Sequence, residues 1–174
     1  MRRELDWRRT FDRLQQAMDD NRGMFLVVPG PSGRANPMTV SWGQIGFVWS
    51  RPIFTVFVRE SRYTHECLVT ADSFTVNVPE PGQLAEELSV CGTTSGRDTD
   101  KLQICALATH PGERVAAPYL SDCSLHYECR IVARRQVELA DIAARDIIEE
   151  HYANGDPHLV VLGEIVGAFV RDDQ

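Results

Sequence analysis

The chain has 174 residues, of which 43% are hydrophobic, and a formal net charge of −7. This length and apolar content fit one domain, residues 1–174, large enough to bury roughly two-thirds of the surface that its unfolded chain exposes. The sequence pI of about 5.2 provides no overall field that would attract nucleic acid or anionic lipid. We therefore expect neither a nucleic-acid partner nor a membrane partner.

The sequence also predicts where the protein is located. Residues 1–9 mix both charge signs without an apolar segment, so they do not form a secretory signal. The longest uncharged stretch, residues 35–50, contains several polar residues and is too short to span a membrane. Five cysteines at irregular spacing, without a C-x-x-C pair, argue against a disulfide framework and fit a reducing compartment. We expect a cytoplasmic protein.

Strands dominate the pattern along the chain. Apolar residues at helical spacing predict a first helix over residues 10–18, and later helices over 83–91 and 141–152. Apolar or alternating runs predict strands over 24–28, 38–42, 53–58, 73–78, 124–138 and 159–170. Because strands and helices do not alternate regularly, a doubly wound parallel sheet is disfavoured. The prediction is a mainly β (α+β) fold, an antiparallel barrel with helices outside.

Three glycines have predicted roles in these elements. Gly92 stands where a C′ glycine would end the helix over 83–91. Gly163 and Gly167 interrupt the last strand, which predicts a bend or the close approach of another group to its backbone.

A metal site is the first functional alternative. Cys123, His126 and Cys129 have three-residue spacing, and in a tight loop they would suit zinc. However, residues 125–131 alternate like a strand, which sends His126 to the face opposite both cysteines. We therefore predict no metal ligands in this chain.

The segment Asn36-Pro37-Met38-Thr39-Val40-Ser41-Trp42-Gly43 places small polar groups and a large aromatic residue on one strand. Alternation from Asn36 puts Met38, Val40 and Trp42 on the same face as Asn36, and Thr39 and Ser41 on the other. The alternative is an ordinary strand that starts at a proline and half-buries a tryptophan.

The segment Arg59-Glu60-Ser61-Arg62-Tyr63-Thr64-His65-Glu66 follows an apolar strand. With Ser61 as the N-cap, the first amides of a helix, the hydroxyls of Ser61 and Thr64, and Arg59 or Arg62 would bind a phosphate. The alternative is a capped helix whose arginines are solvated or paired with neighbouring glutamates.

The segment Cys91 to Lys101 is a loop rich in hydroxyls and glycine, with a cation at its end. It is not a P-loop, because three residues separate its glycines and Arg97-Asp98 follow. No G-x-G-x-x-G follows a strand, so no Rossmann dinucleotide site is predicted. Such a loop either wraps a ligand or joins two helices.

Taken in order, these segments resemble the flavin reductase-like FMN-binding family, and within it the flavoredoxin branch. The resemblance extends over about residues 24–166 and includes Asn36 to Trp42, Ile53 to Thr64, Phe74 to Pro79, Cys91-Gly92 with Ser95 to Asp98 and Lys101, and Gly155-Asp156-Pro157-His158 with Gly163-Glu164-Ile165. Thr109 to Asp122 shows no recognisable motif.

The resemblance implies an FMN-binding split β-barrel with peripheral helices that forms a homodimer. Residues that would line the flavin and its ribityl chain are Asn36, Met38, Thr39, Ser41 and Trp42. Residues that would surround the phosphate are Arg59, Ser61, Arg62 and Thr64, with Lys101 adding charge. A histidine would lie near the ring, and of His126 and His158 we choose His158, which follows a turn.

The function implied is that of an FMN-dependent oxidoreductase, an NAD(P)H-dependent flavin reductase with NADH or NADPH as electron donor. The alternative is a flavoredoxin-like electron carrier with a redox protein partner and no small-molecule substrate of its own. A non-redox binding barrel is a third class, because folds are reused. The sequence leaves open the electron donor and acceptor, and whether FMN is a cofactor or a substrate.

Overall fold

The computed structural model of the chain describes residues 2–19 and 23–171. Its strands are β1 (Arg2–Glu4), β2 (Met24–Pro29), β3 (Ala35–Val40), β4 (Gly43–Val48), β5 (Arg51–Arg59), β6 (Ser73–Val78), β7 (Thr109–His110), β8 (Tyr119–Leu120), β9 (Leu125–Gln136) and β10 (His158–Arg171). Its α-helices are α1 (Phe11–Asp19), α2 (Tyr63–Thr70), α3 (Ala85–Thr93), α4 (Lys101–Ile104) and α5 (Arg145–His151). Short 3₁₀ helices span Trp7–Thr10 and Leu139–Asp141.

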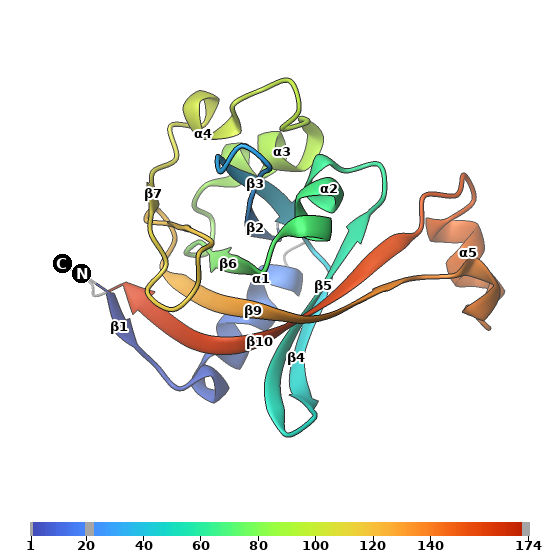
Figure 1. Cartoon of the computed structure of the whole chain (residues 1–174), viewed down its shortest axis with the longest axis horizontal. Coiled ribbons are helices and arrows are strands. Elements are labelled where there is room, and N and C mark those ends of the chain that lie inside the picture. The colour runs from blue at the N-terminus through green and yellow to red at the C-terminus, as the bar shows by residue number, and fades with distance from the viewer. Residues whose placement is uncertain (1, 20–22, 172–174) are drawn as a thin grey trace.

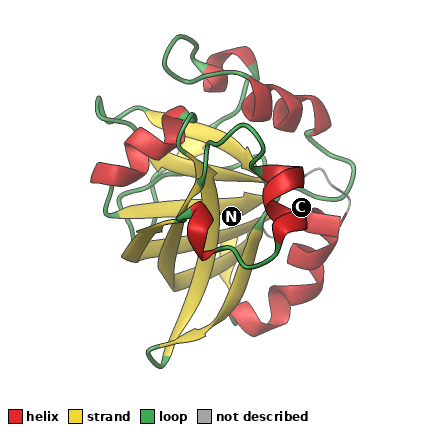
Figure 2. Ribbon diagram, turned by 90° about the vertical axis from the view of Figure 1, so that its right-hand side faces the viewer, coloured by secondary structure: helices red, strands yellow, loops and turns green. Residues whose placement is uncertain are grey.

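One antiparallel sheet forms the body of the molecule, in the order β3-β2-β6-β9-β10-β5-β4, with β1 pairing with β10. Strands β3 and β5 contact each other although they are not neighbours in the strand order of the sheet. The sheet is therefore curled. Figures 1 and 2 show helices around the strands, with α2, α3 and α4 grouped near β2 and β3, and α5 at the far end of β9 and β10. The site described below lies where β3 ends.

The inside of the curled sheet is the main core. Apolar side chains from β2, β5, β6, β9 and β10 are buried there together with Leu14 of α1. The rings of Phe54 and Tyr127 meet edge to face at 5.2 Å, and the buried Tyr127 hydroxyl donates to Thr10 at 2.6 Å. The polar end of the tyrosine thus has the partner that a buried hydroxyl requires.

Gly163 shows why the long last strand contains glycines. The pairing of β9 and β10 shifts register between Leu162 and Gly163. A Cβ atom at position 163 would lie 2.5 Å from the ring of Phe74 and 2.8 Å from Cβ of Cys129. Only a residue without a side chain fits there, which confirms the close approach predicted from the sequence.

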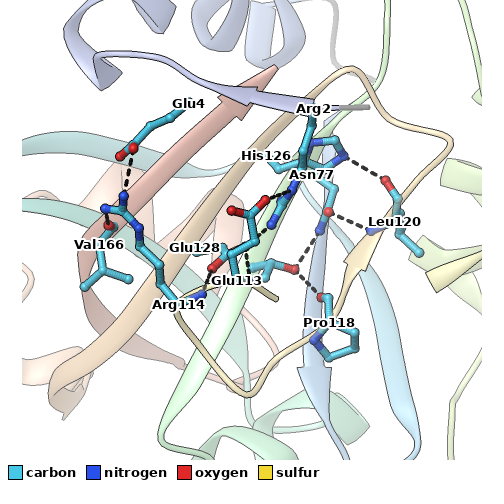
Figure 3. Close-up of polar contacts among 11 residues, drawn as sticks. Arg2, Glu4, Asn77, Glu113, Arg114, Pro118, Leu120, His126, Glu128 and Val166 are labelled. Carbon is cyan, nitrogen blue, oxygen red and sulfur yellow. Dashed lines mark hydrogen bonds and ion pairs between the residues drawn. The ribbon is translucent and has the colours of Figure 1, made fainter. Parts of the chain in front are cut away.

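The loop between α4 and β9, where the sequence shows no motif, is anchored by a buried carboxylate (Figure 3). Glu128 of β9 accepts hydrogen bonds from the backbone amides of Glu113 at 2.9 Å and Arg114 at 2.6 Å. It also pairs with Arg2, whose guanidinium lies 3.7 Å from the ring centre of Tyr119. These contacts hold both the loop and β1 against the barrel, because a buried carboxylate requires charge-assisted partners.

Three predictions about elements are wrong. The strand predicted over 38–42 ends at Val40, and a separate strand, β4, follows it unpredicted. Gly92 lies inside α3, which ends at Thr93. The helix predicted over 141–152 is shorter in the structure, where α5 spans Arg145–His151. None of the residues of α5 is buried. The apolar face that normally stabilises a helix is therefore missing from α5, and its sequence pattern overstates its length.

Candidate functional site

A cleft of about 280 Å³ opens where β3 ends, between β5, the start of β10 and α3. It is lined by Met38, Thr39, Val40, Ser41, Trp42, Phe57, Arg59, Arg62, Gly92 and His158. A second space of about 460 Å³ shares Thr39, Ser41 and Gly92 with it and continues along α3. The structure thus brings most of the predicted site residues into one cleft, drawn from segments far apart in the sequence.

Aromatic rings gather on one side of this cleft. Trp42 is 41% exposed, and its ring centre lies 5.1 Å from that of His158 and 5.0 Å from that of His151. Phe57 of β5 reaches His158 edge to face at 6.3 Å. An exposed tryptophan beside a histidine in a cleft offers a flat surface for stacking a planar ligand.

His158 is neutral at physiological pH. Burial, and then the positive charge of Arg59, lower the pKa of His158 to about 4. The other candidate, His126, lies elsewhere, with its Nε2 atom 2.8 Å from the carbonyl of Leu120 (Figure 3). Of the two histidines that the sequence leaves in competition, only His158 lines the cleft.

The two arginines of the cleft bind carbonyl oxygens. Arg59 donates to the carbonyls of Asp156 at 3.0 Å and His151 at 2.9 Å, so it fastens the turn between α5 and β10. Arg62 donates from one nitrogen to the carbonyl of Gly92, which also lines the cleft. A guanidinium group has five N–H donors, and Arg62 therefore has donors left for an anion.

Ser61 does not cap helix α2, so that prediction is wrong. The N-cap is Arg62, and it makes no side-chain capping bond. Instead, the Ser61 amide and hydroxyl donate to the two carboxylate oxygens of Asp156, at 2.9 and 2.7 Å. Asp156 reaches them from a turn with positive φ at Gly155 and at Asp156 itself. A carboxylate of the chain therefore occupies one of the groups that the sequence assigns to a phosphate, the Ser61 hydroxyl.

Asn36, Thr64 and Lys101 do not line the cleft. Asn36 donates to the Thr64 hydroxyl at 2.8 Å, and both residues are buried. Lys101 is only 4% exposed, and with Asn36 it lines a small pocket beside Gly96. Burial is the main cause that lowers the pKa of Lys101 to about 8. These residues support the segments behind the cleft, and Lys101 places a positive charge near Arg62.

Sequence reasoning did not select Val40, Phe57 and Gly92 as lining residues. Phe57 could have been predicted from the sequence, because strand alternation places it on the same face as Arg59, which was selected. Gly92 was interpreted as a helix terminator and as part of a loop that either wraps a ligand or joins two helices, and it was not selected as a site residue. The neighbours of His158 on α5 and at its end, His151 and Tyr152, gave no signal, because their contacts depend on the turn that Arg59 fastens.

Within residues 2–19 and 23–171, no three His, Cys, Asp or Glu side chains are grouped so that they could hold a metal ion. None of the helices in that part of the chain is long and apolar enough to cross a membrane.

Comparisons with known proteins agree on one family. The model of the family described as "Flavin reductase like domain" matches residues 21–174. An uncharacterised protein of Archaeoglobus fulgidus is 30% identical over 117 residues, which are 67% of this chain and 63% of that protein. The chain thus spans less than two-thirds of the length of this relative.

Solved structures show the same fold. A flavoredoxin from Methanosarcina acetivorans is 27% identical with a TM-score of 0.66, covering 86% of this chain and 69% of that one. An FMN-binding protein from Thermus thermophilus with bound 1-cyclohex-2-enone is 22% identical with a TM-score of 0.63, covering 83% and 67%. The split β-barrel with peripheral helices that the sequence predicts is confirmed.

Proposed function

Because the chain belongs to the flavin reductase-like family, we propose that it is an FMN-binding oxidoreductase that reduces its flavin with NADH or NADPH. Family membership supports a flavin-binding redox function. The observation that carries the FMN part of the proposal is the cleft itself, which is lined by Trp42 and His158 together with Arg62, Thr39 and Ser41. These groups match a ligand with a planar ring, a polyol chain and a phosphate.

The donors of the cleft fit FMN, although fewer are free than the sequence predicts. Thr39 donates to the carbonyl of Leu88 at 2.6 Å, and Ser61 is bound to Asp156. Arg62 keeps donors for a phosphate, and Trp42 is 41% exposed. Bound FMN would supply the hydride and electron chemistry, while the residues of the cleft bind the cofactor and orient it.

Absorption spectroscopy and stopped-flow kinetics test this proposal. The purified protein, or the protein incubated with FMN, should show the absorption of oxidised flavin. Mixing with NADH or NADPH in the stopped-flow instrument should then reduce the flavin and remove this absorption. A protein that takes up no FMN would contradict the cofactor proposal. Uptake of FMN without bleaching by either nucleotide would favour the second candidate, a flavoredoxin-like electron carrier. The likeness to the flavoredoxin of Methanosarcina acetivorans supports that candidate.

We further propose that the protein is a homodimer with the flavin near the subunit interface. The hairpin of β4 and β5 exposes Phe47 by 57% and Trp49 by 65%, and β4 ends the strand order of the sheet. Exposed apolar patches of this kind mark interaction surfaces. Dilution should then release flavin as the dimer dissociates. A monomer by light scattering that retains FMN would contradict the dimer. A redox protein partner and a cytoplasmic location stay predictions.

A further inference from the structure

Tyr152 lies behind the cleft, and its hydroxyl contacts a residue that lines it. It follows the last residue of α5, and its hydroxyl oxygen lies 2.8 Å from Nδ1 of His158. Both side chains are buried, at 8% and 5% exposure. His158 lines the cleft, whereas Tyr152 does not. The Tyr152 ring also lies 5.4 Å from the guanidinium carbon of Arg59, another residue of the cleft, so it is the effect of the Tyr152 hydroxyl that must pass through the imidazole.

The direction of this hydrogen bond follows from the requirements of the two groups. A neutral imidazole has one nitrogen that donates and one that accepts. The Tyr152 hydroxyl has no other acceptor among the hydrogen bonds of the described residues. Leaving its hydrogen unpaired in a buried place would cost about 1–3 kcal/mol. The tyrosine therefore donates to Nδ1 of His158, and the proton of the neutral ring resides on Nε2.

The surroundings keep His158 in this state. Arg59 from β5 fastens the turn before it by binding two carbonyls, and Asp156 of that turn is bound to Ser61. The charged and titratable groups that face His158 are Arg59, Asp156 and His151, and of these Arg59 and His151 oppose its protonation. With Trp42 and Phe57 against its ring, the imidazole is fixed in place and uncharged.

We propose that Tyr152 is a positioning residue that fixes the Nε2–H tautomer of His158, so that the cleft presents a neutral hydrogen-bond donor to an acceptor atom of its ligand. The identity of that ligand as FMN rests on the function proposed above, but the tautomer does not. A donor without charge selects ligands with a carbonyl oxygen or a ring nitrogen lone pair at this position, and it discriminates against N–H groups. Its donor character persists throughout the neutral pH range.

The first test needs no ligand. In protein labelled with ¹⁵N-histidine, the His158 resonances at pH 7 should show Nε2 protonated and Nδ1 unprotonated. In Tyr152→Phe this preference should be lost, and in the control Tyr119→Phe, whose ring packs on Arg2 outside the cleft, it should be retained. An Nδ1–H tautomer in the unsubstituted protein would overturn the proposal, even if Tyr152→Phe does not fold.

The second test uses FMN titration in a double-mutant cycle. Losing one neutral hydrogen bond should make Tyr152→Phe bind FMN about 2- to 10-fold more weakly. In a His158→Gln background the same substitution should have no further effect, because the hydroxyl that it removes acts through His158, whereas the ring that contacts Arg59 is kept. An equal effect in both backgrounds would show a merely structural role and overturn the proposal. If the unsubstituted protein does not bind FMN, the proposed function fails, and the resonance test still decides the tautomer.

Discussion

Replacing Arg62 with alanine tests the phosphate end of the proposed site. Arg62 lines the cleft and uses one nitrogen on the carbonyl of Gly92, so its other N–H groups are left for a ligand anion. A charge-assisted hydrogen bond is worth about 1.5–3 kcal/mol, which corresponds to roughly a 10- to 150-fold loss of FMN affinity. Riboflavin, which lacks the phosphate, should bind Arg62→Ala and the unsubstituted protein about equally.

The assay is calorimetric or fluorescence titration of the apoprotein with FMN and with riboflavin. Arg62→Lys keeps the charge but loses the planar fork, so its affinity for FMN should be intermediate. Arg130→Ala is the matched control, because Arg130 pairs with Glu164 away from the cleft. At saturating FMN, Arg62→Ala should be reduced at nearly the original rate, because a contact remote from the reacting ring contributes equally to ground and transition states. Unchanged FMN affinity in Arg62→Ala, or equal affinities of the unsubstituted protein for the two flavins, would refute this reasoning.

Three further predictions address the ring, the fold and pH. Trp42→Ala should lower both FMN affinity and reduction rate by titration and stopped-flow kinetics, because it removes stacking surface; unchanged values would remove Trp42 from the site. Gly163→Ala should lower the free energy of unfolding in urea by about 1–3 kcal/mol, because its Cβ would meet the ring of Phe74 at 2.5 Å, whereas Gly46→Ala, which meets nothing within 4 Å, should have little effect. Burial lowers the pKa of His126 to about 4, below the value of the unfolded chain, so stability should fall as pH drops from about 6.5 to 4, by on the order of 3 kcal/mol. In His126→Gln the free energy of unfolding in urea should fall less between these two pH values. The same pH dependence in both proteins would contradict the prediction.

The strands that pack on both faces could be predicted from the sequence, and the exposed elements could not. The runs at 24–28, 53–58 and 73–78 lie within β2, β5 and β6, where nearly every side chain is buried and the apolar pattern is strong. In β4 only Ile45 is buried, so an edge strand carrying two glycines leaves almost no pattern. Burial creates the signal that sequence analysis detects, and elements without it are placed by neighbours that are distant in sequence.

The same distinction applies to the site. Trp42, Arg62 and His158 were selected by a resemblance in residue order, and the structure brings their separate segments together in one cleft. The partners of these residues were not predictable. Tyr152 binds His158 across a turn whose shape depends on Arg59, a residue 92 positions before the His151 carbonyl that it binds. Such contacts leave no periodicity in the sequence.

The hydrogen bonds between Ser61 and Asp156 change which residue is expected to bind the phosphate. The sequence assigns an anion to the first amides of the helix, the hydroxyls of Ser61 and Thr64, and Arg59 or Arg62, and the structure places the carboxylate of Asp156 on one of these groups, the Ser61 hydroxyl. A phosphate at that hydroxyl would meet the negative charge of Asp156 at close range, which is unfavourable in a partly buried place. The phosphate of FMN is therefore better placed toward Arg62 and Gly92, with the buried charge of Lys101 behind them. On this reasoning Asp156 serves the site indirectly, by fixing the turn that leads into His158, so that one carboxylate links the two ends of the proposed cofactor site.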